Sequence, residues 1–131
     1  MTHTFFEKNS NYQVERSFKV DQFDIEVSWA YDFTQLELVF DPEGVYWDEL
    51  VEKLDNGEWT HFMLKVAAYY DGREMATEYL GSIVAESPED FIKEDEDGGI
   101  ADMVDSAVDA ARNEALNMID ILKKDFLGVD N

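Results

Sequence analysis

The hydrophobic pattern of the first part of the chain is typical of β-strands. Residues 22–31 alternate between apolar and polar positions, which predicts a strand with one buried face. The same period of two residues marks residues 12–20 and, further on, the set Leu36, Leu38 and Phe40. We therefore expect three consecutive antiparallel strands, with a turn near Asp21 and another at residues 41–44, where Pro and Gly favour chain reversal.

A short helix and a second hairpin are predicted next. Between residues 46 and 54 the apolar positions recur at spacings of three and four, and Asn56-Gly57 supplies a left-handed helix end. Residues 59–70 and 73–84 return to strand character on either side of Asp71-Gly72. Because a two-residue turn between such strands needs positive φ at both positions, the Asp-Gly pair indicates a tight hairpin.

The C-terminal third is predicted to be helical. Ser87-Pro88 offers a hydroxyl cap and a proline suited to the first helical position, and a short helix should run into Gly98-Gly99. Beyond these glycines an apolar stripe at helical spacing continues to a stop near Leu127-Gly128: Ile100, Val104, Ala107, Ala111, Ala115, Met118 and Leu122. The small alanines would let this long helix approach a sheet closely.

These elements predict one α+β domain over residues 1–131. Its antiparallel sheet should have about five strands, in the element order βββαββαα, with the long C-terminal helix packed on one face. Residues 1–10 are expected to fray at the N-terminus.

The charge of the chain changes this picture most. Its 31 Asp and Glu face only 10 Lys and Arg, a formal net charge of -21, yet 45% of the residues are hydrophobic and 14% aromatic. Such a composition supports a folded core, so the negative charge is displayed on a globular protein. Because the repulsion among these charges opposes folding, the excess indicates a basic partner that binds them. General acidity in a salt-loving organism is the alternative, against which the seven Lys, three Arg and plentiful aromatic residues argue.

The acids concentrate in two parts of the chain. Residues 86–109 hold ten acids and one base, Lys93. In residues 41–58 the only base among the acids is Lys53. Acids spaced three or four residues apart on a helix lie about 5 to 6 Å apart along it, comparable with DNA phosphates to within a small factor. The residues predicted to contact a basic partner are Glu89, Asp90, Glu94, Asp95, Glu96, Asp97, Asp102, Asp105 and Asp109 in the first part, and Asp48, Glu49, Glu52 and Asp55 in the second.

Most enzymatic and metal chemistry finds no support in the sequence. The chain has no Cys, two His, no nucleophile-elbow sequence and no phosphate-binding glycine loop, although folding could still assemble a Ser-His-Asp set around His61. If Gly98 is taken as the invariant glycine of a calcium-binding EF-hand loop, Lys93 and Val104 fall at positions that need oxygen ligands. If Gly99 is taken instead, Gly98 falls at such a position. We therefore expect no enzyme, no cofactor and no specific metal site, with weak divalent binding near residues 94–105 left open.

The sequence also predicts where the protein is located and whether it binds nucleic acid or membrane directly. Residues 1–8 lack the basic start and apolar stretch of a signal peptide, and no window approaches the roughly 20 apolar residues of a membrane span. The absence of Cys fits a reducing cytoplasm, and the negative surface should repel both nucleic acid and anionic lipid. A cytoplasmic protein that binds neither nucleic acid nor membrane directly is expected.

In size, charge and lack of catalytic motifs, the chain resembles the small acidic inhibitors of phages and mobile elements that imitate DNA and block restriction, CRISPR or related machinery. The resemblance implies a basic nucleic-acid-binding protein or complex as partner, met in the host cytoplasm. Two alternatives are an immunity protein or antitoxin that caps a basic nuclease, and a viral assembly protein that uses the long helix for oligomer contacts. An apolar patch exposed along residues 100–122 would favour the last, and a homodimer is compatible with each.

Overall fold

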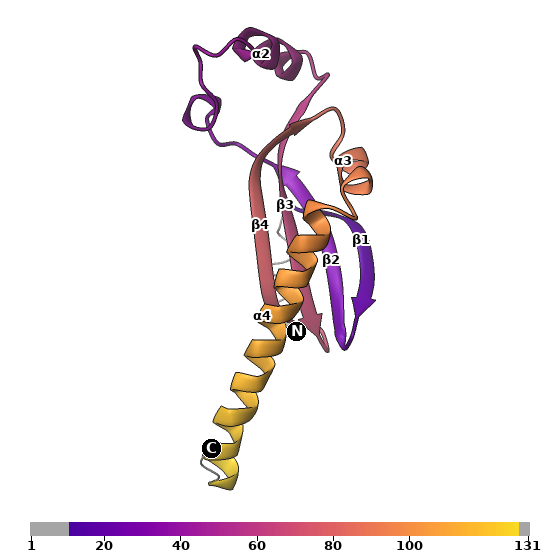
Figure 1. Ribbon diagram of the computed structural model, residues 1–131, viewed down its shortest axis with the longest axis vertical. Helices are drawn as coiled ribbons and strands as arrows, with labels where there is room; N and C mark the ends of the chain where they lie inside the picture. The colour runs from indigo at the N-terminus through magenta and orange to yellow at the C-terminus, as the bar shows by residue number, and fades with distance from the viewer. Residues whose placement is uncertain (1–10, 129–131) are drawn as a thin grey trace.

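The structure is a computed structural model, and it describes residues 11–128; the expected fraying of residues 1–10 lies outside this range. It has the predicted α+β class, with a four-stranded antiparallel sheet and a long C-terminal helix (Figure 1). In chain order the elements are β1 (Gln13–Val20), β2 (Phe23–Tyr31), the 3-10 turn η1 (Leu36–Leu38), α2 (Trp47–Asp55), β3 (Thr60–Tyr70), β4 (Arg73–Ala85), α3 (Pro88–Glu94), α4 (Gly99–Leu122) and the π-helical turn η2 (Lys123–Leu127).

The sheet is a simple meander in the order β1-β2-β3-β4, each strand antiparallel to the next. Asp21, with φ of 53°, turns β1 into β2, as predicted. Asp71 and Gly72, with φ of 50° and 78°, close the hairpin between β3 and β4. The predicted left-handed stop at Gly57 is confirmed, with φ of 81°, and the predicted end near Leu127-Gly128 coincides with a left-handed Gly128, with φ of 68°.

The prediction of a third strand through Leu36, Leu38 and Phe40 is wrong. These residues form η1 and its exit, in which the Leu38 N–H donates to Gln35 and the Phe40 N–H to Leu36, at 3.0 and 2.8 Å. Both edges of β2 are already occupied, by β1 and β3, so a strand that follows β2 directly has no place beside it. Short alternation without a free neighbouring edge does not make a strand, and the sheet therefore has four strands where about five were expected.

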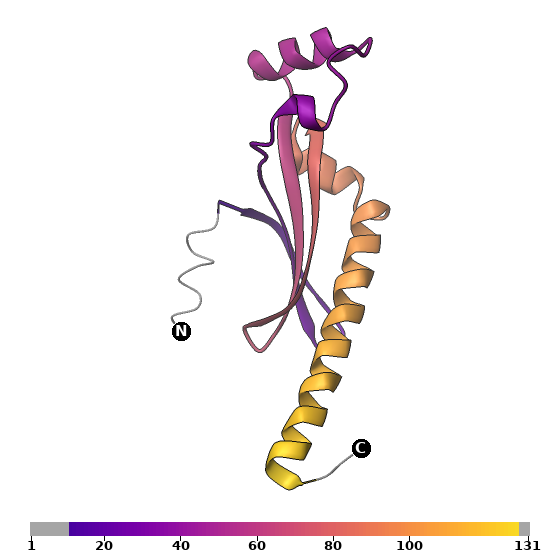
Figure 2. The same ribbon diagram turned by 90° about the vertical axis from the view of Figure 1, so that its left-hand side faces the viewer.

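α4 and α3 cover one face of the sheet and close the core (Figure 2). The core joins the inward residues of β2 and β3 to Ile92 of α3 and to the first half of α4, where Ala107 and Ala111 are fully buried, as the alanine stripe predicted. Ala111 is, however, the last buried residue of α4. Beyond it the helix continues past the end of the sheet, so the molecule is elongated, with α2 at one end and the end of α4 at the other (Figure 1).

No helix within residues 11–128 has the length and apolar character needed to cross a membrane.

Candidate protein-binding surface

The predicted acidic residues of α4 lie on its solvent side. Asp102, Asp105 and Asp109 are all exposed, on the side of the helix opposite Val104 and Ala107. Within residues 11–128, neither Asp102 nor Asp105 forms a salt bridge, whereas Asp109 lies 3.4 Å from Arg112. Arg112 also pairs with Asp21 at 2.6 Å, so the unneutralised part of this surface runs from Asp102 to Asp105 and ends at Asp109.

Further exposed acids lie on α3 and on the turn that leads from it into α4. Ser87 caps α3, as predicted, by accepting the Asp90 N–H at 3.2 Å, which fixes the first turn. Four of the predicted contact residues are exposed on α3 and the turn that follows it: Glu89, Asp90, Glu94 and Asp97. Together with Asp102, Asp105 and Asp109 they form what we call the α3–α4 acidic surface.

Two predicted contact residues are engaged within the protein. Asp95 accepts the Gly99 N–H at 3.3 Å, and its carboxylate lies so close to Gly98 that a Cβ there would stand 2.8 Å from an oxygen. Glu96 forms a salt bridge with Arg16 of β1 at 2.7 Å. Both side chains are half-buried, so their first role is to hold the turn between α3 and α4 against the sheet.

The second group of acids lies on α2, beyond the end of the sheet (Figure 1). Its members Asp48, Glu49, Glu52 and Asp55 are exposed, while Leu50 is the one buried residue of the helix. Lys53 lies 2.7 Å from Glu58, whose hydrogen bond and negative charge raise the pKa of the lysine. That base therefore neutralises Glu58 and leaves the four acids of α2 without a salt bridge among the described residues.

The exposed apolar side chains in the segment between β2 and α2 were not predicted. Phe33, Val45 and Tyr46 are 85%, 89% and 75% exposed, although the helical spacing had placed Tyr46 on the apolar face. Val45 and Tyr46 line a surface groove of about 360 Å³, whose other lining residues are mainly apolar: Phe40, Trp47, Leu50, Trp59 and Val84, with Asp41 and Gly44. Exposed aromatic and apolar residues beside carboxylates are typical of protein interfaces, where Tyr and Trp concentrate binding energy.

A buried polar cluster lies at the end of β2, where the segment that leads to α2 leaves the sheet. Asp32 accepts the N–H groups of Thr34 and Ser82 at 2.9 and 2.7 Å, and its Oδ2 lies 3.6 Å from His61 Nε2. Burial would raise the pKa of Asp32, but the hydrogen bonds from Thr34 and Ser82 and the nearby His61 outweigh it and lower the pKa. The Asp32 carboxylate lies 3.4 Å from the Ser82 hydroxyl and 3.6 Å from His61 Nε2, so the aspartate stands between the serine and the histidine. In a Ser-His-Asp triad the imidazole takes this central place. The cluster is thus a structural anchor for the segment after β2.

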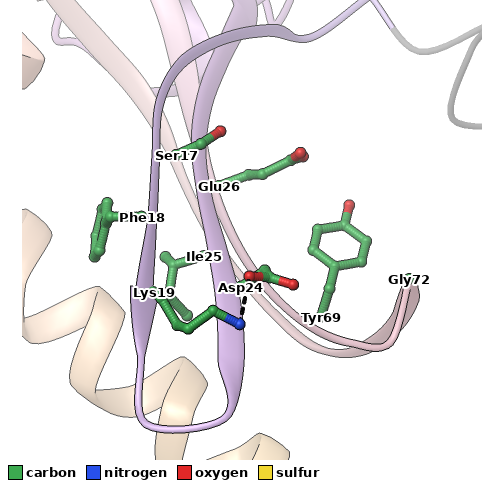
Figure 3. Close-up of a pocket in the computed structure, with 8 residues that line it drawn as sticks. All are labelled: Ser17, Phe18, Lys19, Asp24, Ile25, Glu26, Tyr69 and Gly72. Carbon is green, nitrogen blue, oxygen red and sulfur yellow. Dashed lines mark ion pairs between the residues drawn. The ribbon is translucent and has the colours of Figure 1, made fainter.

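The uncovered face of the sheet carries a broad hollow of about 690 Å³ between β1, β2 and the turn of the second hairpin (Figure 3). Figure 3 shows Ser17, Glu26 and Tyr69 on this face, with Phe18 turned to the other side. Lys19 is already paired with Asp24 at 3.2 Å, so the hollow offers no free base. In the part of the chain that the structure describes, no three acidic or His side chains are grouped so as to hold a metal ion.

Comparison with known protein families, with curated proteins and with solved structures finds no match to this chain.

Proposed function

We propose that this protein is an inhibitor that binds a basic nucleic-acid-binding protein or complex and blocks the channel that would hold DNA or RNA. The observation that carries the proposal is the α3–α4 acidic surface, whose exposed carboxylates on α3 and at Asp102 and Asp105 have no salt-bridge partner within residues 11–128. The helices that display them are packed on the sheet through Ile92, Ile100 and Val104, so the carboxylates are presented on a rigid support.

The spacing of these charges supports imitation of a polynucleotide. From Asp102 to Asp109 the helix axis advances by about 10 Å, at roughly 1.5 Å per residue, and it carries three carboxylates over that length. One strand of duplex DNA presents about three phosphates over the same length, at roughly 3.4 Å each. Arg112 already pairs with Asp109, so two unpaired carboxylates remain over this length. A basic channel that neutralises phosphates would therefore meet a linear charge density on α4 comparable with that of one DNA strand to within a factor of about two.

The segment around α2 would add short-range contacts to this attraction. The four acids of α2, which have no salt bridge within residues 11–128, follow directly on the exposed Val45 and Tyr46 in the chain. Long-range charge steers two proteins together, while buried aromatic anchors lengthen the lifetime of the complex. A restriction or CRISPR complex, with a large basic channel, is the kind of host-defence target that this combination fits.

The test is to capture partners from a host lysate on the immobilised full chain and to elute them with duplex DNA at constant salt. Proteins that bind nucleic acid and are displaced by DNA are expected. With a partner in hand, Asp105→Lys should slow association about tenfold or more at low salt. Glu114→Lys is the matched control, because it makes the same charge change at an exposed position of the same helix outside the acidic surface. Equal effects of the two variants, or a captured set without nucleic-acid-binding proteins, would contradict the proposal.

A cap on the active site of a basic nuclease, as made by an immunity protein or antitoxin, is the second candidate. The exposed apolar residues next to α2 favour it, because a compact active site is sealed by a few well-packed anchors. Tyr46→Ala and Phe33→Ala would then weaken binding through faster dissociation by tenfold or more, while Asp105→Lys would change it little.

A further inference from the structure

The far half of α4 exposes an unusual amount of apolar surface. After Ala111 the apolar stripe continues along the helix as it passes the hairpin tips (Figure 1), but none of its residues is fully buried: Ala115 and Met118 are half-buried and Leu122 is exposed. Large apolar residues in this half and in η2 are between 46% and 79% exposed: Leu116, Ile119, Ile121 and Leu122 in α4, and Phe126 and Leu127 in η2. Large apolar side chains exposed in such number within one short segment are typical of an interaction site, and oligomer contacts along this helix are the kind of interaction that such exposure favours.

A groove lies beside this half of the helix. It has a volume of about 590 Å³ and separates α4 from the tips of the two hairpins; its main lining residues are Phe23, Tyr70, Met75, Ala115, Met118 and Leu122. Figure 2 shows the end of α4 continuing beyond both hairpin tips. The molecule therefore presents an apolar projection and an apolar groove next to each other, which we call the α4 end surface (residues 115–127 of α4 and η2, with residues 70–75).

The charge of this surface differs from that of the rest of the molecule. Its acids are Asp71, Glu74, Asp120 and Asp125, and its bases are Arg73, Lys123 and Lys124. Four acids and three bases leave a net charge of -1, against -21 for the whole chain. Charges of both signs alternate here, whereas the α2 and α3–α4 surfaces are acidic almost throughout.

We propose that two copies of this chain associate through the α4 end surface, with the projecting helix end of each seated against the groove of the other about a two-fold axis. Such an interface is self-complementary, because each surface patch meets its own counterpart. The apolar side chains supply the attraction, and Lys123 of one copy can face the acids of the other. Contact through either acidic surface would instead bring like charges together, which opposes association.

The proposed dimer has a distinctive dependence on salt. The two copies repel each other at long range, and salt screens that repulsion, so added NaCl should strengthen the dimer. Binding of a basic partner to an acidic surface depends on attraction and should weaken under the same conditions. The two associations therefore respond to salt with opposite signs, and each can fail without the other.

Sedimentation equilibrium of the full chain, over about 1 to 200 µM and at low and high NaCl, tests the proposal. A monomer–dimer equilibrium that tightens severalfold with salt is expected. Ile119→Lys and, separately, Phe126→Lys should weaken the dimer at least tenfold, because each places a charge in the apolar contact. Val45→Lys is the control, since it makes the same change at an apolar residue exposed at the other end of the molecule.

Circular dichroism checks that the variants keep the wild-type helix content, which is expected because Ile119 and Phe126 lie outside the core. A chain that stays monomeric at 200 µM in high salt overturns the proposal, and so does a dimer that Ile119→Lys and Phe126→Lys leave intact. A dimer weakened equally by Val45→Lys overturns the assignment to this surface.

Discussion

Replacing Asp32 by Ala should destabilise the protein more than any other loss of one acidic side chain. The Asp32 side chain is 2% exposed and accepts two backbone N–H groups, from Ser82 at 2.7 Å and from Thr34 at 2.9 Å. A hydrogen bond to a charged group contributes about 1.5 to 3 kcal/mol, so loss of both gives about 3 to 6 kcal/mol. Thr34 lies in an exposed segment where water can replace the lost acceptor, which places the expected loss near 3 kcal/mol.

Urea unfolding followed by Trp fluorescence measures this loss, with the slope m checked for constancy. Asp32→Asn keeps the shape and one acceptor oxygen, so it should lose about half as much. Glu37→Ala removes an exposed carboxylate from the same segment and should change the free energy of unfolding by less than about 0.5 kcal/mol. A loss below about 1 kcal/mol for Asp32→Ala would refute the reasoning.

The pH dependence of the same comparison has a definite sign. The pKa of Asp32 is lower in the folded protein than its ordinary value, so the ionised carboxylate stabilises the fold above the unfolded pKa. That stabilisation disappears as the pH falls through the lower, folded pKa. The difference in unfolding free energy between wild type and Asp32→Asn should therefore be constant above about pH 5 and shrink below about pH 4. A difference that grows on acidification would contradict it.

Three further predictions concern stability. Ser87→Ala should cost about 1 kcal/mol in urea unfolding, because it removes the cap of α3, while Ser106→Ala on the exposed side of α4 should cost nothing. Gly72→Ala should cost about 1 to 2 kcal/mol, because a φ of 78° strains a residue with a Cβ; an unchanged midpoint would exclude that strain. Raising NaCl from about 0.02 to 0.5 M should raise the Tm by several degrees, since salt screens the repulsion of 31 acids, and a falling Tm would count against it.

The elements that sequence predicted best are those whose geometry is demanded locally. Asp71-Gly72 requires positive φ at two adjacent residues, and Ser87-Pro88 provides both a cap and a first helical residue, so short-range chemistry sufficed. The false strand at residues 36–40 shows the limit, because a strand needs a free neighbouring edge and the edges of β2 were taken. Likewise, the apolar period of α4 gave the buried face but not the point where the sheet ends, after Ala111.

The candidate site also contains residues that the sequence could place and contacts that it could not. Helical spacing alone placed Asp102, Asp105 and Asp109 on the solvent side of α4. It could not show that Glu96 pairs with Arg16, or that Asp32 meets His61 and Ser82, since these residues are far apart in the chain. The positive φ of Ser82, 56°, has no sequence signal either, because Ser does not favour that region.

The uncovered half of α4 also determines where the native protein opens first. From Arg112 to Leu122 the backbone hydrogen bonds are supported by no buried side chain, and a helical segment of that length is marginal in water on its own. In the monomer its amide protons should exchange with solvent through local fraying, while those between Met103 and Ala111 exchange only when the core unfolds. Such fraying gives up contacts with the hairpin tips at Phe23, Tyr70 and Met75, so the far end of α4 can melt and re-form while the core stays folded.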